Sequence, residues 1–371
     1  MNLDDLPVVD GHGHPLLADP WAVAPERFLQ LFTEGRPGAM TDHVAHTGYF
    51  RRAVHALAAR LGTSPTVEAV LERRRMLGPE AARRAVVESR VEVLLVDTGY
   101  PPGAMPLGEM RRLLPCAIHE IFRIETCAQD LLAEALPYDE FLAAFGRALR
   151  GAAGRAVAFK SVIAYRSGLA IQPWRRENAA ASYQRALARL RGTGSPRLVD
   201  KPLLDTLFAA TLEVARETGR PLQVHAGWGD ADIDLPQANP VLLRPILEDP
   251  RWREVRIVVL HQAYPYFREA AFLSAVWPQV YLDLSLVIPY LGPGAIAPLI
   301  EILSLAPSSK LLYGSDVQGL PELFALSADW GRAALGEALD WLGARRGLGG
   351  GAGRAVARQI LSENARALYR V

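Results

Sequence analysis

The stretch Val8-Val9-Asp10-Gly11-His12-Gly13-His14 places two histidines two residues apart at the end of a short apolar run. Residues two apart on an extended chain point to the same side, so both imidazoles can face one point. The two glycines add no bulk, and Pro15 ends the segment because it cannot donate a ladder hydrogen bond. The stretch therefore predicts a buried strand that presents two nitrogen ligands to a divalent metal ion. A flexible N-terminus that happens to contain histidines is the alternative.

Seven further apolar runs have the length and residue types of strands, and helical patterns separate them. With the first run, over Leu6–Asp10, the set continues as Val91–Asp97, Ala117–Glu125, Val157–Ile163, Pro221–His225, Val255–His261, Val280–Leu286 and Lys310–Asp316. Strands that alternate with helices imply a parallel sheet with both faces covered, and eight repeats predict an α/β fold, the (β/α)8 TIM barrel. A doubly wound open sheet is the competing fold, but no Gly-x-Gly-x-x-Gly opens a helix after the first strand.

Residues 18–90 show no strand pattern. Helical periodicity there covers Pro25–Phe32, Asp42–Leu61, Thr66–Leu77 and Pro79–Ser89, which is more helix than one barrel crossover needs. We therefore expect a single barrel domain over residues 1–371, with an inserted helical cap over 18–90 that lies over the C-terminal mouth of the barrel. Near the C-terminus, the Gly-rich stretch 347–353 is typical of a mobile loop.

The charge balance of the chain limits its partners. Lys and Arg number 41 and Asp and Glu number 40 among 371 residues, a formal net charge of +1 at pH 7, which does not favour nucleic acid or an anionic membrane surface. Two cysteines are too few for a disulfide framework. Asp4 and Asp5 stand where a secretion signal would be basic, and no apolar run approaches the ~20 residues of a membrane span. We expect a cytoplasmic homo-oligomer that acts on a small-molecule substrate, without nucleic acid or membrane as a partner.

Metal-binding and titratable side chains recur where the predicted strands end. His12 and His14 follow the first strand, and further candidates end the fifth, sixth and eighth strands, namely His225, His261 and Asp316. Barrel enzymes build their active sites at the C-terminal ends of the strands, so we expect these side chains to meet there. A hydrogen-bonded core or capping role is the alternative for each residue alone, but the joint pattern indicates a catalytic metal centre.

In this order, Asp10-x-His12-x-His14, His225, His261 and Gly314-Ser315-Asp316 resemble the amidohydrolase superfamily of metal-dependent hydrolases. Three further stretches are similar to its amidohydrolase-2 branch: His261–Ala270, Tyr281–Ser285 and Ile360–Arg366. Phe159-Lys160-Ser161 and Tyr165–Leu169 resemble a subgroup related to the N-terminal half of fungal fusion proteins that carry a glutamine synthetase-like domain. Bacterial γ-glutamyl amide hydrolases are expected relatives in that subgroup.

The resemblance implies one divalent metal ion, with zinc expected and Mn or Fe as alternatives, held by His12, His14, His225 and Asp316. Such an ion lowers the pKa of a bound water toward ~7. Asp316 would take the proton from this water and pass it to the leaving group, and His261 would stabilise the developing oxyanion. Asp283 is either a residue that orients a ligand imidazole or a plain strand-end residue.

Lys160 has three interpretations: a carboxylated bridge between two metal ions as in binuclear members, a partner in a substrate contact or structural ion pair, or an exposed lysine. Arg123 and Glu125 share one face near the end of the third predicted strand. Arg grips carboxylates bidentately and Glu can hold an amine. With Tyr165 and Arg166 they suit an amino-acid-like substrate, and an ion pair in the barrel mouth is the alternative.

The expected function is therefore metal-dependent hydrolysis of a C–N, amide-type bond in a small polar substrate, such as a γ-glutamyl amide. A metal-dependent decarboxylase of an aromatic or unsaturated carboxylic acid is the alternative, since some amidohydrolase-2 relatives run that reaction on the same mononuclear site. A third interpretation is a metal-binding protein without turnover. A structural site, however, closes with four ligands and needs no extra base, which argues against this class.

Overall fold

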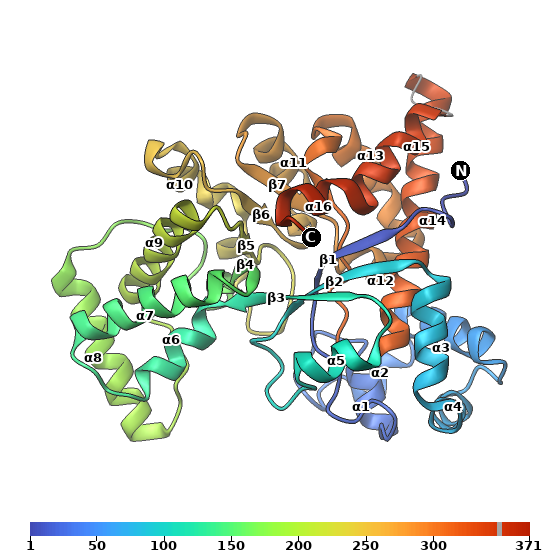
Figure 1. Ribbon diagram of the computed structural model, residues 1–371, viewed down its shortest axis with the longest axis horizontal. Coiled ribbons are helices and arrows are strands. Elements are labelled where there is room, and N and C mark those ends of the chain that lie inside the picture. Colours follow the sequence, from blue (N-terminus) through green and yellow to red (C-terminus); the bar gives the residue numbers. More distant parts are fainter. Residues whose placement is uncertain (347–350) are drawn as a thin grey trace. The chain divides into compact units, whose positions relative to one another are not determined.

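The computed structural model describes residues 1–346 and 351–371. Its eight strands form one sheet whose spatial order follows the chain (Figure 1). They are β1 (Val8–Gly13), β2 (Val91–Asp97), β3 (Ala117–Arg123), β4 (Ala156–Ser161), β5 (Leu222–Val224), β6 (Ile257–Val259), β7 (Val280–Asp283) and β8 (Leu311–Leu312). The registered pairs are parallel. The predicted (β/α)8 TIM barrel is confirmed, and the doubly wound alternative is wrong because sequential strands are neighbours throughout.

Helices follow every strand, in the alternation that the sequence predicts. They are α1 (Pro25–Gln30), α2 (Thr41–Val44), α3 (Gly48–Leu61), α4 (Val67–Glu88), α5 (Leu107–Leu113), α6 (Ile124–Leu132), α7 (Tyr138–Ala153), α8 (Arg176–Thr193), α9 (Lys201–Thr218), α10 (Arg244–Glu248), α11 (Phe267–Val276), α12 (Val287–Leu291), α13 (Ile296–Leu305), α14 (Pro321–Arg346), α15 (Gly351–Arg358) and α16 (Asn364–Tyr369). Short 3-10 turns join several of them, including η1 (Ile163–Tyr165).

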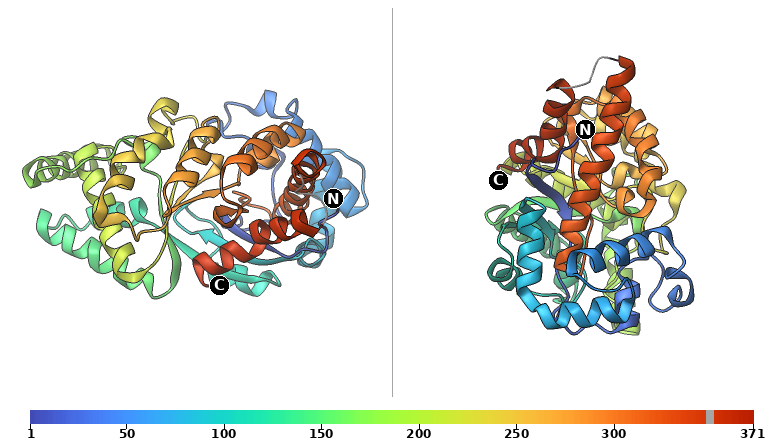
Figure 2. Two further views of the ribbon diagram at one scale, coloured as in Figure 1. Left: turned by 90° about the horizontal axis from the view of Figure 1, so that it is seen from above. Right: turned by 90° about the vertical axis from the view of Figure 1, so that its right-hand side faces the viewer.

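The chain divides into two compact units. Unit 1 comprises Met1–His119, Gly229–Ala231 and Asp283–Val371, and unit 2 comprises Glu120–Trp228 and Asp232–Leu282. In unit 1 the first strand is bound to the residue that follows the last strand, because the backbone N–H of Gly11 donates to the carbonyl of Tyr313 at 2.9 Å. The N-terminus lies beside α14, where the Met1 ammonium pairs with Asp340 (Figure 2).

Residues 18–90 belong to unit 1 and, all of them being described, contain helices and no strand. The side chains of Thr47 and Thr66 cap α3 and α4 by accepting hydrogen bonds from backbone N–H groups. α4 breaks at Gly78, whose φ of +58° favours glycine, and helical backbone resumes at Pro79. Both α3 and α4 pack against α14.

The expectation that no apolar run approaches the length of a membrane span is wrong. Val287–Leu305 has 19 residues and is apolar enough, by length and composition, to cross a membrane. In the fold this stretch is α12, a 3-10 turn that begins at Gly292 (φ +57°), and α13, and both helices pack against α14 in unit 1. A mobile loop is predicted over residues 347–353. Residues 347–350 of this stretch lie outside the described residues, and the remaining three belong to the start of α15.

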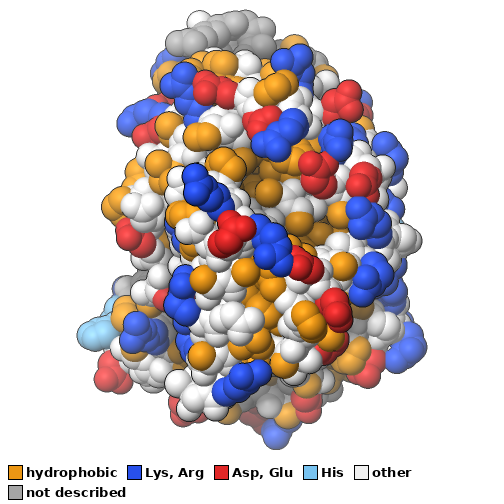
Figure 3. All heavy atoms as spheres, turned by 90° about the vertical axis from the view of Figure 1, so that its left-hand side faces the viewer, with side chains coloured by type: hydrophobic (Ala, Val, Ile, Leu, Met, Phe, Trp, Pro, Cys, Tyr) orange, Lys and Arg blue, Asp and Glu red, His pale blue; other side chains and the backbone are white. Residues whose placement is uncertain are grey.

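Unit 2 has its own apolar core around β4, β5 and β6. On α7 the residues Phe141, Phe145 and Leu149 recur at four-residue spacing and are fully buried, which is the pattern of a helix with one face in the core. On the face drawn in Figure 3, basic and acidic side chains lie side by side with hydrophobic ones between them, in line with the balanced charge of the chain.

Candidate functional site

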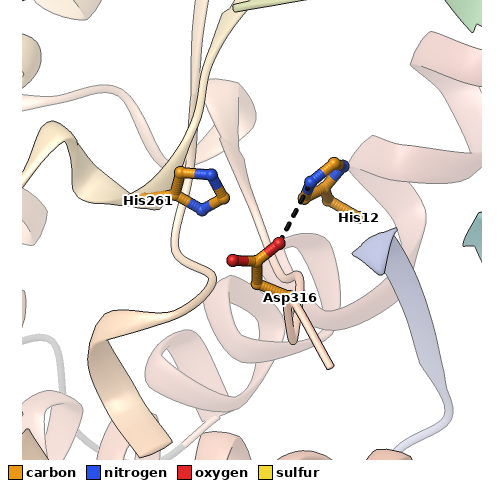
Figure 4. A group of neighbouring side chains, drawn as sticks. All are labelled: His12, His261 and Asp316. Carbon is orange, nitrogen blue, oxygen red and sulfur yellow. Dashed lines mark ion pairs between the residues drawn. The ribbon is translucent and has the colours of Figure 1, made fainter. Parts of the chain in front are cut away.

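Two histidines of unit 1 converge on one carboxylate oxygen. The Nε2 atoms of His12, on β1, and His14, just after it, lie 3.1 and 3.3 Å from Oδ1 of Asp316. The dashed line in Figure 4 marks the pair between His12 and Asp316; His261, also drawn there, belongs to unit 2. The two imidazole rings are 5.3 Å apart and nearly perpendicular. The His-x-His spacing and the acid after the eighth strand thus meet within unit 1.

Asp316 is held in an unfavourable backbone conformation. It lies four residues beyond the end of β8, not on the strand, and its φ of +58° is uncommon for a residue with a side chain. Its backbone N–H donates to the carbonyl of His12 at 2.8 Å. The carboxylate of Asp10 accepts hydrogen bonds from the backbone N–H groups of His12 and Ser315, and burial raises the pKa of Asp10 to about 7. The bonds between β1 and the segment after β8 hold the backbone of Ser315 and Asp316 beside His12.

The surroundings of His14 select the nitrogen that faces Asp316. Its Nδ1 lies 3.3 Å from the carbonyl oxygen of Tyr100, which can only accept, so Nδ1 carries the proton of that bond. In the neutral ring Nε2 then has a lone pair that points at a carboxylate oxygen, and two acceptors at this distance repel unless a proton or a cation lies between them. Imidazole nitrogens with a carboxylate oxygen are a donor set for Zn²⁺, Mn²⁺ or Fe²⁺, so the residues present fit such an ion.

In unit 2, His225 and His261 lie one and two residues beyond their strands. Their rings are 4.5 Å apart, and the ring of Tyr165 lies 4.3 Å from that of His225. His261 has a φ of +61°, a left-handed conformation that is uncommon for a residue with a side chain. A Cβ on Gly227 would lie 2.3 Å from the carbonyl oxygen of Ala263, so a glycine is required for the turns after β5 and β6 to approach each other.

Lys160 lies on β4 between Arg123 of β3 and Gln223 of β5 in the strand register, and only 1% of its side chain is exposed. The interpretation of Lys160 as an exposed lysine is therefore wrong. A carboxylated metal bridge and a substrate contact or structural ion pair stay open for this residue.

Glu125 requires a correction. β3 ends at Arg123 and α6 begins at Ile124, so Glu125 lies in the first turn of a helix and does not share a strand face with Arg123. Its side chain is buried, and its Oε1 accepts hydrogen bonds from the hydroxyl of Ser161 at 2.6 Å and the backbone N–H of Val162 at 3.0 Å. Burial raises the pKa of this carboxyl group.

Residues 135–371, well over half of the chain, match the family model described as Amidohydrolase. The chain belongs to the amidohydrolase family. It is 32% identical over 364 residues to the protein fluG of Emericella nidulans. The aligned region covers 89% of this chain but only 42% of fluG. The chain therefore spans less than half of this relative.

Solved structures share the fold of this chain. A candidate metal-dependent hydrolase from Lactobacillus casei is 28% identical, has a TM-score of 0.88, and the alignment covers 99% of this chain and 96% of that one. Uronate isomerase of Thermotoga maritima shares the fold, with a TM-score of 0.68 at 13% identity and coverage of 99% and 95%. The amidohydrolase is thus an enzyme of a metal-dependent family, with a His/His/Asp arrangement that suits a metal ion.

Beside Asp316 lies a group of residues that no sequence pattern predicts. A cavity of about 20 Å³ in unit 1 is lined by Asp316 together with Glu34, Tyr49 and Tyr290. The Tyr290 hydroxyl donates to the Glu34 carboxylate at 2.6 Å, and burial followed by the charge of Asp316 raises the pKa of Glu34 to about 8. No local pattern marks a single glutamate between two helices, so only the tertiary fold brings Glu34 to this place.

Asp283 ends β7 of the amidohydrolase and is held by its neighbours. Its Oδ1 accepts a hydrogen bond from the backbone N–H of Ser285 at 3.0 Å and another from the Ser285 hydroxyl. A Cβ on Gly314 would lie 2.3 Å from Oδ2 of Asp283, so this glycine is required for the close approach. A role for Asp283 in orienting a ligand imidazole stays a prediction.

Proposed function

We propose that this amidohydrolase hydrolyses a C–N, amide-type bond of a small polar substrate, with γ-glutamyl amides as the first class to test. The observation that carries the proposal is the approach of the His12 and His14 Nε2 atoms to one oxygen of Asp316, at 3.1 and 3.3 Å. Family membership supports a metal-dependent reaction at this site.

The proposed ligands of a single divalent ion are His12, His14, His225 and Asp316, with zinc expected and Mn or Fe as alternatives. When bound, such an ion lowers the pKa of a water toward ~7 and polarises a carbonyl oxygen. The Nδ1–H group of His14 donates to the carbonyl of Tyr100, which leaves the lone pair of Nε2 to bind the ion.

Two residues of the chain are proposed to act on protons and charge. The Asp316 carboxylate would accept a proton from the attacking water and pass it to the departing amine. His261 would donate a hydrogen bond to the carbonyl oxygen as negative charge develops there. Asp10 contributes indirectly, because its hydrogen bonds to the backbone of His12 and Ser315 hold the two elements in place.

Product analysis tests the proposed reaction. Purified protein would be incubated with a panel of γ-glutamyl amides and, separately, with aromatic carboxylic acids. We expect release of ammonia or amine from at least one amide and no release of carbon dioxide. Carbon dioxide from an aromatic acid would instead support the decarboxylase, and neither product from metal-loaded protein would support metal binding without turnover.

Elemental analysis of protein purified without chelator separates the two interpretations of Lys160. One divalent ion per chain is expected. Two tightly held ions per chain would favour a carboxylated Lys160 that bridges them.

A further inference from the structure

Buried polar atoms without hydrogen-bond partners gather after β3 and β4 of unit 2. Among the described residues they are Nε and Nη1 of Arg166, Oγ of Ser167 and Oε2 of Glu125. Nearly all buried polar groups in folded proteins have partners, so each exception requires an explanation. A ligand that supplies the missing partners is one such explanation.

Arg166 follows η1, and its backbone N–H donates to the carbonyl of Ile163 at 2.9 Å. Burial lowers the pKa of Arg166, and the positive charges of Arg197 and Arg123 lower it further, yet a guanidinium stays charged at physiological pH. Arg197 already forms an ion pair with Asp232, so it is not the group in need of an anion. The unmet N–H groups of Arg166 therefore suit an anionic ligand, and guanidinium groups bind carboxylates well.

Glu125 supplies the complementary charge. Only 3% of its side chain is exposed, and Ser161 and Val162 occupy Oε1, which leaves Oε2 without a partner in the described residues. Oε1 of Glu125 is bound to Val162, and Arg166 follows the 3-10 turn that begins at the next residue, so both groups belong to the turn after β4. An ammonium group would both satisfy Oε2 and compensate a buried carboxylate. The Ser167 hydroxyl can donate to or accept from either part of such a ligand.

This corner adjoins a residue of the proposed metal centre within the same unit. Tyr165 immediately precedes Arg166 in the chain, and its ring lies 4.3 Å from that of His225. The residues proposed to bind the ligand are therefore linked to His225 through Tyr165.

We propose that Arg166, Ser167 and Glu125 form a subsite for the α-carboxylate and α-ammonium groups of an amino-acid-type substrate. The link to catalysis rests on the proposed amide hydrolysis, but the subsite itself is a claim about binding. It assigns the carboxylate to Arg166 and Ser167 and the ammonium group to Glu125. It also specifies that the bond to be cleaved lies on the amino acid's side chain, away from these two groups.

Calorimetric titration of the full chain in its purified, metal-containing form tests the subsite without turnover. The probes are L-glutamate, L-aspartate and L-alanine, each compared with its α-amide, which lacks the carboxylate charge. We expect at least one amino acid to bind more tightly than its α-amide. The Arg166→Met variant should lose about tenfold to a hundredfold in affinity for that amino acid, the range of a lost charged hydrogen bond, and bind the α-amide as before.

Arg150→Met is the matched control, because Arg150 lies on an exposed surface of the same unit and pairs with Glu217. It should bind the probes like the unaltered protein. Glu125→Gln should weaken binding of the amino acid about tenfold but leave its deaminated analogue unchanged, glutarate in the case of L-glutamate. Thermal unfolding of each variant identifies any that fail to fold, and Arg166→Gln, which removes the charge but keeps a polar side chain, then replaces Arg166→Met in the same comparison.

The subsite is overturned if no amino acid of the panel binds more tightly than its α-amide, or if Arg166→Met binds as tightly as the unaltered protein. Its failure is distinct from that of the proposed function. Binding that depends on Arg166, with no amine released from any amide, would keep the subsite and refute the hydrolase. Release of an amine together with binding that does not depend on Arg166 would keep the hydrolase and refute the subsite.

Discussion

At the scale of single residues, Asp316 has two proposed tasks, as a metal ligand and as a proton acceptor. Asp316→Asn keeps the size and one oxygen donor, so the metal should remain bound. The proton acceptor is lost, and we expect the rate of amide hydrolysis to fall ~10²–10⁴-fold, as is typical for a general base. Steady-state kinetics across added metal concentrations should show no recovery. A metal-loaded Asp316→Asn variant with near-normal turnover would leave Asp316 as a ligand only.

His14 has one proposed task, which makes it the counterpart to Asp316. Its Nε2 faces Asp316 at 3.3 Å and its Nδ1 is bound to Tyr100. His14→Ala removes one nitrogen ligand, so metal affinity should fall and activity should partly return at high metal concentration. Metal titration followed by an activity assay checks this. Activity that is lost and stays lost at saturating metal would show that His14 does more than bind the ion.

The two cysteines should be unreactive in the folded protein. Burial raises the pKa of Cys116 to about 12 and that of Cys127 to about 11. Only the thiolate is nucleophilic, and at neutral pH almost none forms at these pKa values. We expect slow labelling by iodoacetamide at pH 7.5 and rapid labelling of both thiols after unfolding in urea, measured by mass spectrometry. Rapid labelling of the native protein would contradict this expectation.

Which site residues can be predicted from sequence depends on where they stand in the chain. His12, His14 and Asp316 follow apolar runs and so are recognisable as strand-end groups. Glu34 follows no strand and belongs to no motif, and it reaches Asp316 only through the packing of unit 1. The apolar run after Ala117 continues through Ile121 and Ile124 and so predicts a strand at Glu125, but the helix α6 already begins at Ile124.

At the scale of elements, a buried ion pair joins α4 to α14. Nε and Nη2 of Arg74 each donate to a carboxylate oxygen of Glu322 at 2.9 Å, and neither side chain is exposed. Removing one partner leaves a buried charge, so Glu322→Gln should lower the free energy of unfolding by ~3–5 kcal/mol. Urea unfolding measures this change.

A double variant and an exposed pair serve as controls for this prediction. Arg74→Met with Glu322→Met removes both charges and fills the space, so it should recover most of the stability lost in Glu322→Gln. Disrupting the exposed pair of Arg150 and Glu217 should change the free energy of unfolding far less than Glu322→Gln does, because solvent screens exposed charges. Equal losses in the single and double variants would show that shape at this position matters more than charge.

Element boundaries differ most where strands are short. The apolar runs around β5, β6 and β8 suggest longer strands than the two or three residues that the structure assigns to each. The reason is that residues such as Leu260 and Tyr313 are buried although they lie beyond the strands, so the apolar pattern continues into the loops. The Gly78-Pro79 break in α4 follows directly from residue type, since glycine permits the positive φ and proline starts a helix.

At the scale of the whole molecule, the alternation of eight apolar runs with helices was enough to predict the barrel. That pattern reflects parallel strands buried on both faces, which a doubly wound sheet shares, and the number of repeats with the missing Gly-x-Gly-x-x-Gly favours the barrel. The division into two compact units could not be predicted, because it depends on how side chains from distant parts of the chain pack together. The substrate could not be predicted from the sequence for a related reason, because the side chains proposed to bind it, Arg166 and Glu125, belong to different helical turns that only the fold brings to the end of β4.

Metal removal gives a test at this scale that needs no substrate. An ion that binds only the folded protein stabilises it by RT ln(1 + [L]/Kd), which is ~2.7 kcal/mol at a hundredfold excess over Kd. Extraction with a chelator should therefore lower the melting temperature, and added zinc should restore it, as measured by scanning calorimetry.

His12→Ala should remove the response to zinc, since His12 contributes a proposed ligand atom from β1. His261→Asn should keep it, because His261 is assigned to the oxyanion and not to the ion. Loss of the zinc response in His261→Asn would make His261 a ligand, and a melting temperature indifferent to both chelator and zinc would refute the metal centre itself.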